Sequence, residues 1–581
     1  MSALWSHLTS RHAWLLLLVL TLLLYLPGTG SIPLMDRDEP RFARATVEMM
    51  QRGDWVIPWF NGEYRFDKPP LTYWWMRLHF HLLGVNELAA RLHSVVSVWL
   101  VALVIFRMGR DLGGRAAGWW GAVGWITSLQ TLIHGRLCVA DMPMVLCVAL
   151  AMLALSKILL SPPDEARPFS KWWWVLWCSL GLGFLAKGPI ALLVPALALV
   201  LFRLAFWRKP MPWGKLGLGS GLVLALAMVA AWGIPALVQT EGKFWNVGMG
   251  EHVVKRGTQA FNGRTILPGY YLISAFLSLL PWMVFLPHMW RHVRSRWDAH
   301  RALLVAWFAA PQLIFLFYAT QLPHYTMPGF AGFFVLLGLT LADGQQRSFI
   351  PTKLGRFGIT YLGLLVLLSI GMITALWAGG IVPQSSLRLM LTSGAVMLGA
   401  LAVLGAAVVW RRWMLAGVSL VAVALGLAVF GSSLRSIHPI VQMAPALRSL
   451  PKESNAIAWQ YTEPCLVFYS DHSWTMLSKI ERVRERMHQP RTGMVVAQIS
   501  EWTLAQWWKS LTTGTQHTTS RDFQKEVEAL TSAVSTDYDW KDTSGFNAAR
   551  SSWVTVRVFV RKQPSTPSGP ELTVQRAGSD R

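Results

Sequence analysis

Long apolar blocks, separated by short polar segments, run along the first 435 residues of the chain. The blocks are about 18–25 residues long, the length at which a helix crosses the hydrocarbon core of a bilayer. Hydropathy and loop charge together predict roughly thirteen transmembrane helices. They are expected at residues 13–34, 91–108, 116–134, 142–160, 172–186, 189–206, 216–238, 267–288, 302–320, 326–342, 357–378, 389–409 and 413–433. This pattern predicts an all-α polytopic membrane protein.

The charge of the connecting loops alternates along the chain. Lysine and arginine concentrate in every second loop, as in Arg107–Arg115 and Arg203–Lys215. Loops of this kind lie in the cytoplasm. The other loops carry acidic and aromatic residues, so we expect them on the outer side. The apolar stretch Trp14–Leu26 has no small-residue cleavage site and is expected to stay as a first span and signal anchor.

Polar and apolar residues mix after Ser432, where the long apolar blocks end. Short strands are predicted at 465–470, 493–499 and 553–561, and amphipathic helices at 474–487 and 500–511. These elements predict a small α/β domain, which an odd number of spans places on the outer side.

The sequence therefore predicts three parts. The first is a transmembrane domain at residues 1–435, whose first outer loop is 35–90. The α/β domain follows at 436–565. Residues 566–581 are rich in Pro, Ser and Gly and are expected to be a disordered tail.

Composition agrees with a membrane protein and narrows its partners. The chain is 53% hydrophobic and 14% charged, whereas soluble proteins carry about 25% charged residues. The net charge of +23 would favour nucleic acid in a soluble protein. Here the basic inner loops account for it, and no nucleic-acid-binding motif accompanies it, so we expect no nucleic-acid partner. The four cysteines show no paired spacing, which argues against a disulfide framework or a zinc site.

The segment Met35–Pro70 differs from a simple connector between two spans. It contains Asp36, Asp38, Glu39, Asp67 and Lys68, in a chain where charge is scarce. Several tryptophan and phenylalanine residues are interleaved with these groups, and a helix is expected over Glu39–Gln51. We interpret this segment as the floor of an active site at the membrane surface.

Several polar clusters fall on the same predicted outer side. They are Asp36–Arg41, Asp67–Pro70, Arg136 with Asp141, Lys187–Pro189, and Glu251–Arg256 with His324 and Tyr325. Each cluster alone has a structural explanation. Asp38 suits a helix N-cap, Lys68 and Lys187 suit snorkelling to the interface, and Arg136 suits an ion pair with Asp141. Together they favour a site, because ionisable groups on the rim of an apolar bundle are costly.

This combination of cations, carboxylates and an aromatic-lined groove suits a lipid with a phosphate head. Lysine and arginine would hold the phosphate and stabilise the charge that grows on it as it leaves. An aspartate would accept a proton from an acceptor hydroxyl or orient that hydroxyl. The candidate carboxylates are Asp38, Glu39 and Asp141, and the candidate substrate-binding residues are Arg41, Lys68, Arg136, Lys187, Lys255, Arg256 and Tyr325. The sequence therefore predicts group transfer from a lipid phosphate.

Five segments resemble the ArnT-like glycosyltransferases, the lipid A aminoarabinose transferases that are related to protein O-mannosyltransferases. They are DRDEPRFA (36–43), GDWVIPWFNGEYRFDKPPLTYWW (53–75), GRLCVADMP (135–143), LAKGP (185–189) and EHVVKR (251–256). The resemblance implies a GT-C fold in a bacterial inner membrane. It also implies a polyprenyl-phosphate sugar donor, such as undecaprenyl phosphate, and transfer on the periplasmic face.

The resemblance also implies roles for individual residues. Asp38 corresponds to the acid of the catalytic site, Lys68 and Lys187 to the lysines of the family's KPP and KGP motifs, and Asp141 to the aspartate of the second outer loop. In this family the Lys68 counterpart contacts the lipid phosphate. The residues that correspond to Asp67 and His252 can bind a divalent metal; otherwise no cofactor is implied.

Two positions depart from the family pattern. Gln321 stands where the aminoarabinose enzymes usually have a lysine, and Lys255 stands where an arginine is expected. The first change removes a cation from the acceptor or phosphate region. Lipid A, an envelope glycan and a protein therefore all stay open as acceptors, and the sugar is also open.

Two other functions fit parts of the pattern. A transporter or flippase for a lipid-linked precursor would carry its charged residues on broken helices near the bilayer midplane, whereas here they gather in outer loops. A non-catalytic subunit that binds lipid-linked sugar would not need the acid and lysine constellation. A glycosyltransferase accounts for both features.

Overall fold

The computed structural model describes residues 10–35, 37–160, 169–206, 212–248, 269–316, 318, 320–346, 355–378, 385–503, 506, 521–548 and 550–562. The chain divides into two compact units, Met1–Val441 and Gln442–Arg581. The expected tail at 566–581 and most of the expected helix at 500–511 lie outside the described residues.

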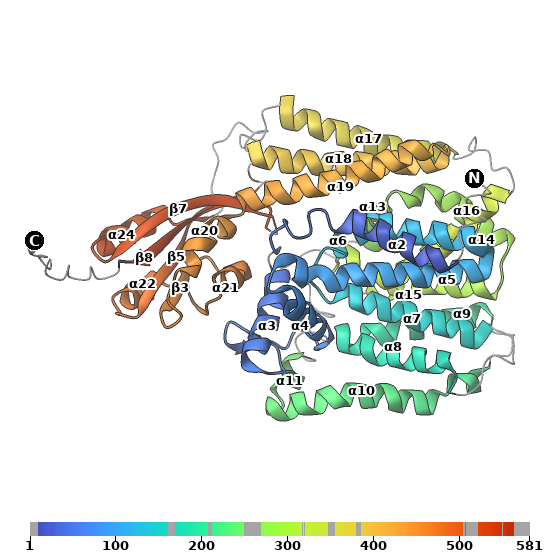
Figure 1. Ribbon diagram of the computed structural model, residues 1–581, viewed down its shortest axis with the longest axis horizontal. Helices are drawn as coiled ribbons and strands as arrows, with labels where there is room; N and C mark the ends of the chain where they lie inside the picture. Colours follow the sequence, from blue (N-terminus) through green and yellow to red (C-terminus); the bar gives the residue numbers. More distant parts are fainter. Residues whose placement is uncertain are drawn as a thin grey trace, which may run out of the picture. The chain divides into compact units, whose positions relative to one another are not determined.

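The first unit is helical (Figure 1). Its main helices are α2 (Ser10–Tyr25), α3 (Glu39–Arg52), α4 (Leu71–Leu83), α5 (Glu87–Thr127), α6 (Leu129–His134), α7 (Asp141–Leu160), α8 (Lys171–Lys187), α9 (Ile190–Ala205), α10 (Leu218–Gln239), α11 (Lys243–Trp245), α13 (Tyr270–Ser278), α14 (Leu286–Ser295), α15 (Ala299–Leu316), α16 (Phe330–Gln346), α17 (Gly355–Ala378), α18 (Ser385–Val409) and α19 (Trp413–Ile437). Short 3-10 turns lie at Trp213–Leu216 (η2), Trp282–Phe285 (η5) and Pro323–Gly329 (η6).

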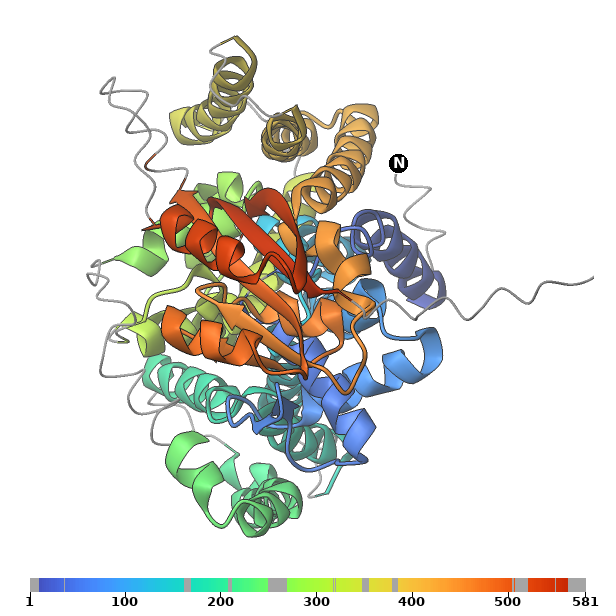
Figure 2. The same ribbon diagram turned by 90° about the vertical axis from the view of Figure 1, so that its left-hand side faces the viewer.

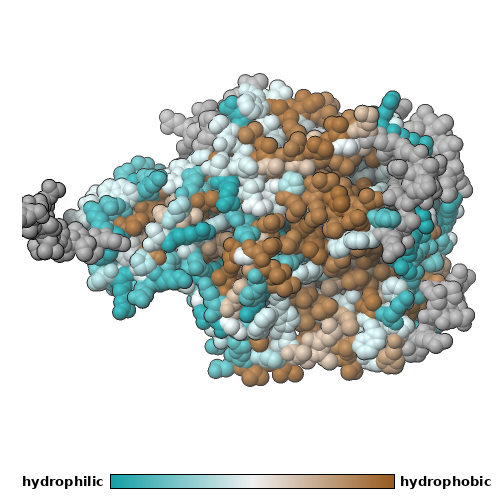
Figure 3. Space-filling view, viewed as in Figure 1, coloured by the Kyte–Doolittle hydropathy of each residue, from teal (hydrophilic) through white to brown (hydrophobic). Residues whose placement is uncertain are grey.

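Many of these helices have the length and composition of membrane spans. Within the described ranges, eight pass that test, or nine if one bent pair counts as a single span. Apolar side chains cover much of the visible face of this unit (Figure 3). The polytopic helical class is thereby confirmed, while the expected number of spans stays a prediction.

Helix α5 is a hairpin of two arms. Gly114 has a φ of 83°, which is not helical, and the chain reverses there. A Cβ atom on Gly109 would lie 2.8 Å from the Cα of Gly118, and the indole of Trp125 donates a 3.0 Å hydrogen bond to the carbonyl of Val98. The expected spans at 91–108 and 116–134 correspond to these two arms, although the second arm ends at Thr127 and a separate helix, α6, follows.

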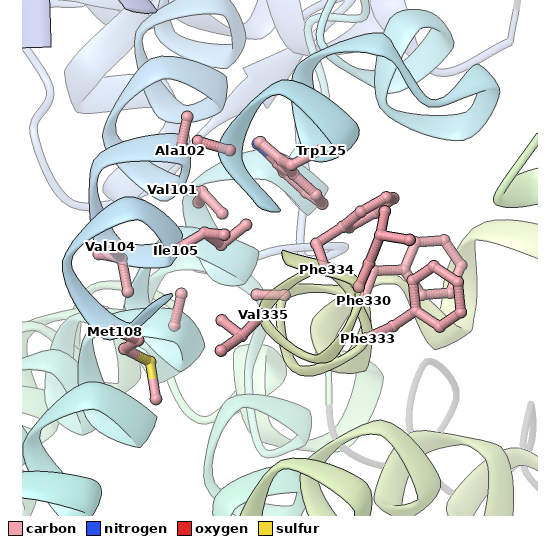
Figure 4. Close-up of a cluster of buried hydrophobic side chains, with 14 of the residues drawn as sticks. Val101, Ala102, Val104, Ile105, Met108, Trp125, Phe330, Phe333, Phe334 and Val335 are labelled. Carbon is pink, nitrogen blue, oxygen red and sulfur yellow. The ribbon is translucent and has the colours of Figure 1, made fainter. Parts of the chain in front are cut away.

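The core of the unit forms where α16 packs against both arms of α5. Figure 4 shows Val101 and Ile105 of α5 near Trp125 and the phenylalanines of α16. The rings of Trp125 and Phe334 lie 6.1 Å apart, edge to face. A Cβ atom on Gly338 would lie 2.1 Å from the carbonyl oxygen of Ala117. Glycine therefore allows the two backbones to touch, as small residues do between membrane helices.

The expected continuous span at 267–288 is wrong. Helices α13 and α14 are separated by a break at which the chain bends by 108°. The carbonyl of Leu280, at this break, accepts a 3.0 Å hydrogen bond from the amide of Leu129, and the indole of Trp282 donates to the Thr127 hydroxyl at 3.0 Å. The apolar pattern did not reveal the break because a neighbouring helix satisfies its backbone groups.

The first outer loop folds into α3, a two-residue β-hairpin and α4. Helix α3 confirms the expected helix, and it ends at Gly53, which adopts a left-handed φ of 66°. Strands β1 (Trp59–Phe60) and β2 (Glu63–Tyr64) pair antiparallel. The side chain of Gln239 at the end of α10 donates a 2.8 Å hydrogen bond to Asp54. This hydrogen bond links the first outer loop to α10. The loop's elements lie at the same end of the helices as α11 (Figure 1).

The second unit is a mixed sheet with helices. Its elements are α20 (Pro439–Arg448), β3 (Asn455–Trp459), α21 (Pro464–Ser470), β4 (Trp474–Leu477), α22 (Ile480–Met487), β5 (Thr492–Thr503), β6 (Arg521–Asp522), α24 (Gln524–Val534), β7 (Tyr538–Asn547) and β8 (Ser552–Arg561). The strand order is β4-β3-β5-β8-β7, and β6 pairs with β5. Strands β3, β4 and β5 are parallel, and β5, β8 and β7 are antiparallel.

The elements of this unit agree only in part with expectation. The strands expected at 493–499 and 553–561 are confirmed within β5 and β8. The strand at 465–470 is wrong, since this segment is α21, and the helix at 474–487 begins as strand β4. Residues of α22 and α24, such as Val483 and Leu530, pack in one cluster with Val495 of β5. Both helices therefore cover the same face of the sheet, seen in orange and red in Figure 2.

Candidate active site

A mostly apolar cavity of about 500 Å³ opens between α8, α9, α10 and α15. Leu193, Val229 and Ile314 are among the side chains that form its apolar wall. Its polar lining includes Lys68 and Lys187, from the first outer loop and the end of α8. The structure therefore brings together two predicted lysines that are far apart in the sequence.

Lys187 is held at a sharp turn between two helices. It is the last residue of α8, and Gly188 follows with a φ of 80° before Pro189 starts α9. Its ammonium forms an ion pair with the carboxylate of Asp141 and lies 5.5 Å from the centre of the Tyr325 ring. Tyr325 also lines the cavity. The turn and the ion pair fix the cation at the cavity wall.

Asp141 is the first residue of α7 and is only 6% exposed. The Oδ1 atom of Asp141, which pairs with Lys187, also lies 3.8 Å from the Nε2 atom of His324. The ion pair between Asp141 and Arg136, which was the structural explanation considered for these two residues, does not form: Asp141 pairs with Lys187, and Arg136 donates to backbone carbonyls. Asp141 therefore lies behind the cavity wall, where it orients Lys187.

Lys68 lies beside a second charged group. Its ammonium donates a 2.8 Å hydrogen bond to the carbonyl of Asp67, whose carboxylate is 2.8 Å from the guanidinium of Arg65. Arg65 also donates to the Tyr73 hydroxyl at 3.1 Å. Burial lowers the pKa of Arg65, but Tyr73 and Asp67 outweigh burial and raise that pKa above its usual value. Arg65 is thus a permanent cation in contact with the Asp67–Lys68 segment.

Asp38 directly precedes α3, and its side chain is exposed. It occupies the N-cap position but makes no side-chain capping hydrogen bond, so the capping explanation is wrong. Its negative charge contributes to the raised pKa of Arg65. The acid is therefore electrostatically linked to the Lys68 side of the cavity. Arg41 lies one turn further along α3 and is half-buried.

Glu39 is buried in an ion pair. Its carboxylate accepts hydrogen bonds from Arg91 at 2.8 and 2.7 Å and from the amide of Cys138 at 2.8 Å. Arg91, which is 0% exposed, also donates to the carbonyls of Thr29, Ile32 and Pro33. This arrangement fixes the start of the first outer loop. Glu39, the residue after Asp38, therefore has a structural role.

Arg136 lies inside the helical unit. It donates to the carbonyls of Leu132 and Leu24, and its guanidinium lies 4.7 Å from the centre of the Tyr25 ring. Burial lowers the pKa of Arg136 to about 10. The cavity lining described above does not include it. Its predicted role in substrate binding has no support from its contacts and stays a prediction.

The remaining predicted residues concern the metal and the basic loop. His252, Lys255 and Arg256 lie outside the described residues. Asp67 lies at the cavity, where its carboxylate already contacts Arg65. In the part of the chain that the structure describes, no three His, Cys, Asp or Glu side chains are grouped as metal ligands. Asp67 and His252 thus stay predicted ligands.

Sequence reasoning missed two arginines that organise the site, Arg65 and Arg91. A signal existed for Arg91, since an arginine within an apolar block is costly and calls for a partner. Arg65 lies two residues before Asp67, and this spacing in an extended chain does not predict a contact between the two side chains. The pairing of His134 with His324, whose rings are 4.6 Å apart, was also missed because it joins distant segments.

Known proteins resemble this chain in sequence. A family described as dolichyl-phosphate-mannose-protein mannosyltransferase matches residues 67–234. The undecaprenyl phosphate-alpha-4-amino-4-deoxy-L-arabinose arabinosyl transferase of Aeromonas salmonicida is 29% identical over 70% of this chain and 74% of its own length. The enzyme of the same description from Edwardsiella ictaluri is 29% identical over 56% of this chain and 58% of its own length.

Solved structures show the same fold. ArnT from Cupriavidus metallidurans, bound to undecaprenyl phosphate, superposes with a TM-score of 0.70 at 19% identity, over 94% of this chain and 98% of its own. An oligosaccharyltransferase from Archaeoglobus fulgidus gives a TM-score of 0.50 at 12% identity, over 84% of this chain and 69% of its own. In sequence the chain is similar to the ArnT-like glycosyltransferases, and it shares their GT-C fold.

Proposed function

We propose that the protein transfers a sugar from a polyprenyl-phosphate donor, such as undecaprenyl phosphate, to an acceptor at the outer face of a bacterial inner membrane. The observation that carries this proposal is the pair Lys68 and Lys187 on one apolar cavity. Apolar walls suit an isoprenoid tail, and two cations suit its phosphate. Lipid A, an envelope glycan and a protein are the acceptor classes.

The reaction follows from the charges around the cavity. The acceptor oxygen attacks the anomeric carbon of the sugar, and the bond between that carbon and the phosphate oxygen breaks. Lys68 and Lys187 stabilise the negative charge on the departing lipid phosphate. Asp38, exposed and not used for capping, accepts the proton of an acceptor hydroxyl or orients an acceptor that is already ionised.

Neighbouring residues position these groups. The Glu39–Arg91 pair holds the start of the loop that carries Asp38, and Arg65 supports the Asp67–Lys68 segment. Asp141 keeps Lys187 at the cavity wall. A divalent metal at Asp67 and His252 would add positive charge near the phosphate.

The proposed orientation follows from loop charge. The basic loops face the cytoplasm, so the cavity end of the helices and the second unit face the periplasm. Donor, bilayer and acceptor are the only partners that this activity needs.

Release of lipid phosphate tests the proposal. Purified protein in liposomes is given undecaprenyl-phosphate-linked sugar and a mixture of envelope acceptors, and free undecaprenyl phosphate is measured. We expect acceptor-dependent release by the wild type. Asp38→Asn should bind undecaprenyl phosphate normally but release at least about 100-fold less, as for loss of a general base.

Lys68→Ala should lose both binding and release. Lys171→Ala, at the opposite end of α8 from Lys187, is the matched control and should behave as the wild type. Translocation of the donor without bond cleavage would instead identify a flippase and contradict the proposal. Full turnover by Asp38→Asn would contradict the assignment of the acid.

A further inference from the structure

A chain of polar side chains runs behind the cavity wall, from α7 to α13. The hydroxyl of Ser278 donates to Oε1 of Gln130 at 3.1 Å, and Nε2 of Gln130 lies 2.8 Å from Nδ1 of His134. The ring of His134 packs on that of His324, which approaches Asp141. These five residues come from four different elements, so their alignment is a feature of the fold.

The chain ends at the carboxylate that also holds Lys187. Within the described part of the protein, the cavity lining includes Lys187 and Tyr325 but neither Asp141 nor His324. Lys187 thus separates the cavity from Asp141. A phosphate in the cavity competes with Asp141 for the same ammonium group. When Lys187 turns toward the phosphate, the charge on Asp141, whose side chain is 9% exposed, has to be balanced by another group.

The geometry points to His324 as that group. We propose that His324 is a positioning residue: it takes up a proton and donates to Asp141 when Lys187 turns to the donor phosphate. This inference rests on the proposed function. It adds an exchange of partners at Asp141, in which the His324 imidazole replaces the Lys187 ammonium.

The groups around His324 define where the additional proton resides. Among the described residues, the charged and titratable groups that act on it are Asp141, His134 and Lys187, and the Tyr325 ring packs edge-on against it at 5.0 Å. Because Ser278 occupies the amide oxygen of Gln130, the amide nitrogen donates to Nδ1 of His134. That bond keeps the Nδ1 lone pair of His134 engaged and His134 neutral. The additional proton therefore resides on His324, next to Asp141.

The exchange has a proton balance that can be measured. Binding of a lipid phosphate takes up a proton from solution, and its release returns the proton. Binding must then weaken as the pH rises, because the neutral imidazole no longer balances the negative charge of Asp141. A purely structural histidine would produce neither effect.

The test uses the full-length protein in detergent, with undecaprenyl phosphate as the probe and a pH indicator in weak buffer. The wild type should take up a proton on binding, and its affinity should fall between pH 6 and pH 8. His324→Gln should bind about tenfold more weakly at pH 6, the size expected for loss of one charge-assisted hydrogen bond, with no proton uptake and a flat pH profile.

His292→Gln is the matched control, since His292 is also a buried histidine near an aspartate but lies on α14. It should keep the proton uptake of the wild type. Binding by the wild type without proton uptake would overturn the inference and leave the proposed function intact. No binding of undecaprenyl phosphate by the wild type would overturn both. The proton measurement on the wild type needs no variant to fold.

Discussion

At the scale of single residues, the cost of an unpaired buried charge decides how variants of the site behave. Lys187→Ala removes the partner of Asp141, whose side chain is 9% exposed. We expect this variant to lose about 3 kcal/mol of stability, the low end for breaking a buried ion pair, and to lose binding of lipid phosphate. Thermal unfolding in detergent and a binding assay measure the two effects.

The double variant Lys187→Ala/Asp141→Asn separates these effects. It removes the uncompensated charge, so most of the lost stability should return. Binding of lipid phosphate should stay absent, because the cation is still missing. A double variant as unstable as Lys187→Ala alone would mean that packing, and not charge, holds this corner of the site.

A second residue-scale prediction concerns Glu39. Glu39→Gln keeps the shape of the side chain but leaves Arg91, which is 0% exposed, without its counter-charge. We expect a loss of about 3–5 kcal/mol in unfolding free energy, measured by thermal unfolding. A well-folded Glu39→Gln protein without turnover would instead support a direct catalytic role.

Sequence reasoning indicated which side of the membrane a residue lies on better than the direction of its side chain. Lys68 and Lys187 were expected on one side of the membrane, and they do share one cavity. Loop charge indicates the side of the bilayer, but not where a side chain points. The sequence therefore allowed an ion pair between Arg136 and Asp141, which are five residues apart. In the structure Arg136 instead contacts the carbonyls of Leu132 and Leu24.

At the scale of elements, glycine contacts between helices carry a clear prediction. Gly338→Ala on α16 brings a Cβ atom to within 2.1 Å of the Ala117 carbonyl, whereas Gly363 on α17 has nothing within 4 Å. We expect Gly338→Ala to lower stability by about 1–3 kcal/mol and Gly363→Ala to be neutral or slightly stabilising. Thermal unfolding of the two variants compares them directly. Equal melting temperatures would contradict the close packing of α5 and α16.

The elements that could be predicted are those whose pattern has a single interpretation. Apolar blocks of about 20 residues admit only a membrane span, and helices such as α7 and α18 begin within a few residues of the expected positions. A short apolar run such as Cys465–Ser470 fits a buried helix as well as a strand. Here Pro464 starts a helix, α21, because proline suits the first turn.

At the scale of the whole molecule, the proposed orientation predicts which surfaces face the periplasm. Single cysteines replace Glu63 in the first outer loop, Lys452 in the second unit and Arg115 beside the α5 turn, all of which are exposed. The background lacks the native cysteines. A membrane-impermeant maleimide should label Glu63→Cys and Lys452→Cys in intact spheroplasts, and Arg115→Cys only after lysis. Labelling of Arg115→Cys in intact spheroplasts would reverse the orientation.

The hydrogen bonds of Arg91 to the start of the first outer loop have a consequence for how the protein folds during synthesis. The carbonyls and the carboxylate that Arg91 binds all precede it in the chain, between Thr29 and Glu39. During synthesis, the segment from Thr29 to Glu39 leaves the translocon before Arg91, which holds it, has been made. In the proposed orientation, we therefore expect the nascent loop to cross the membrane open and to close only when α5 inserts. With the proposed orientation, a stalled chain that ends before Arg91 should stay sensitive in this loop to protease added on the periplasmic side, and a chain that ends after α5 should resist it.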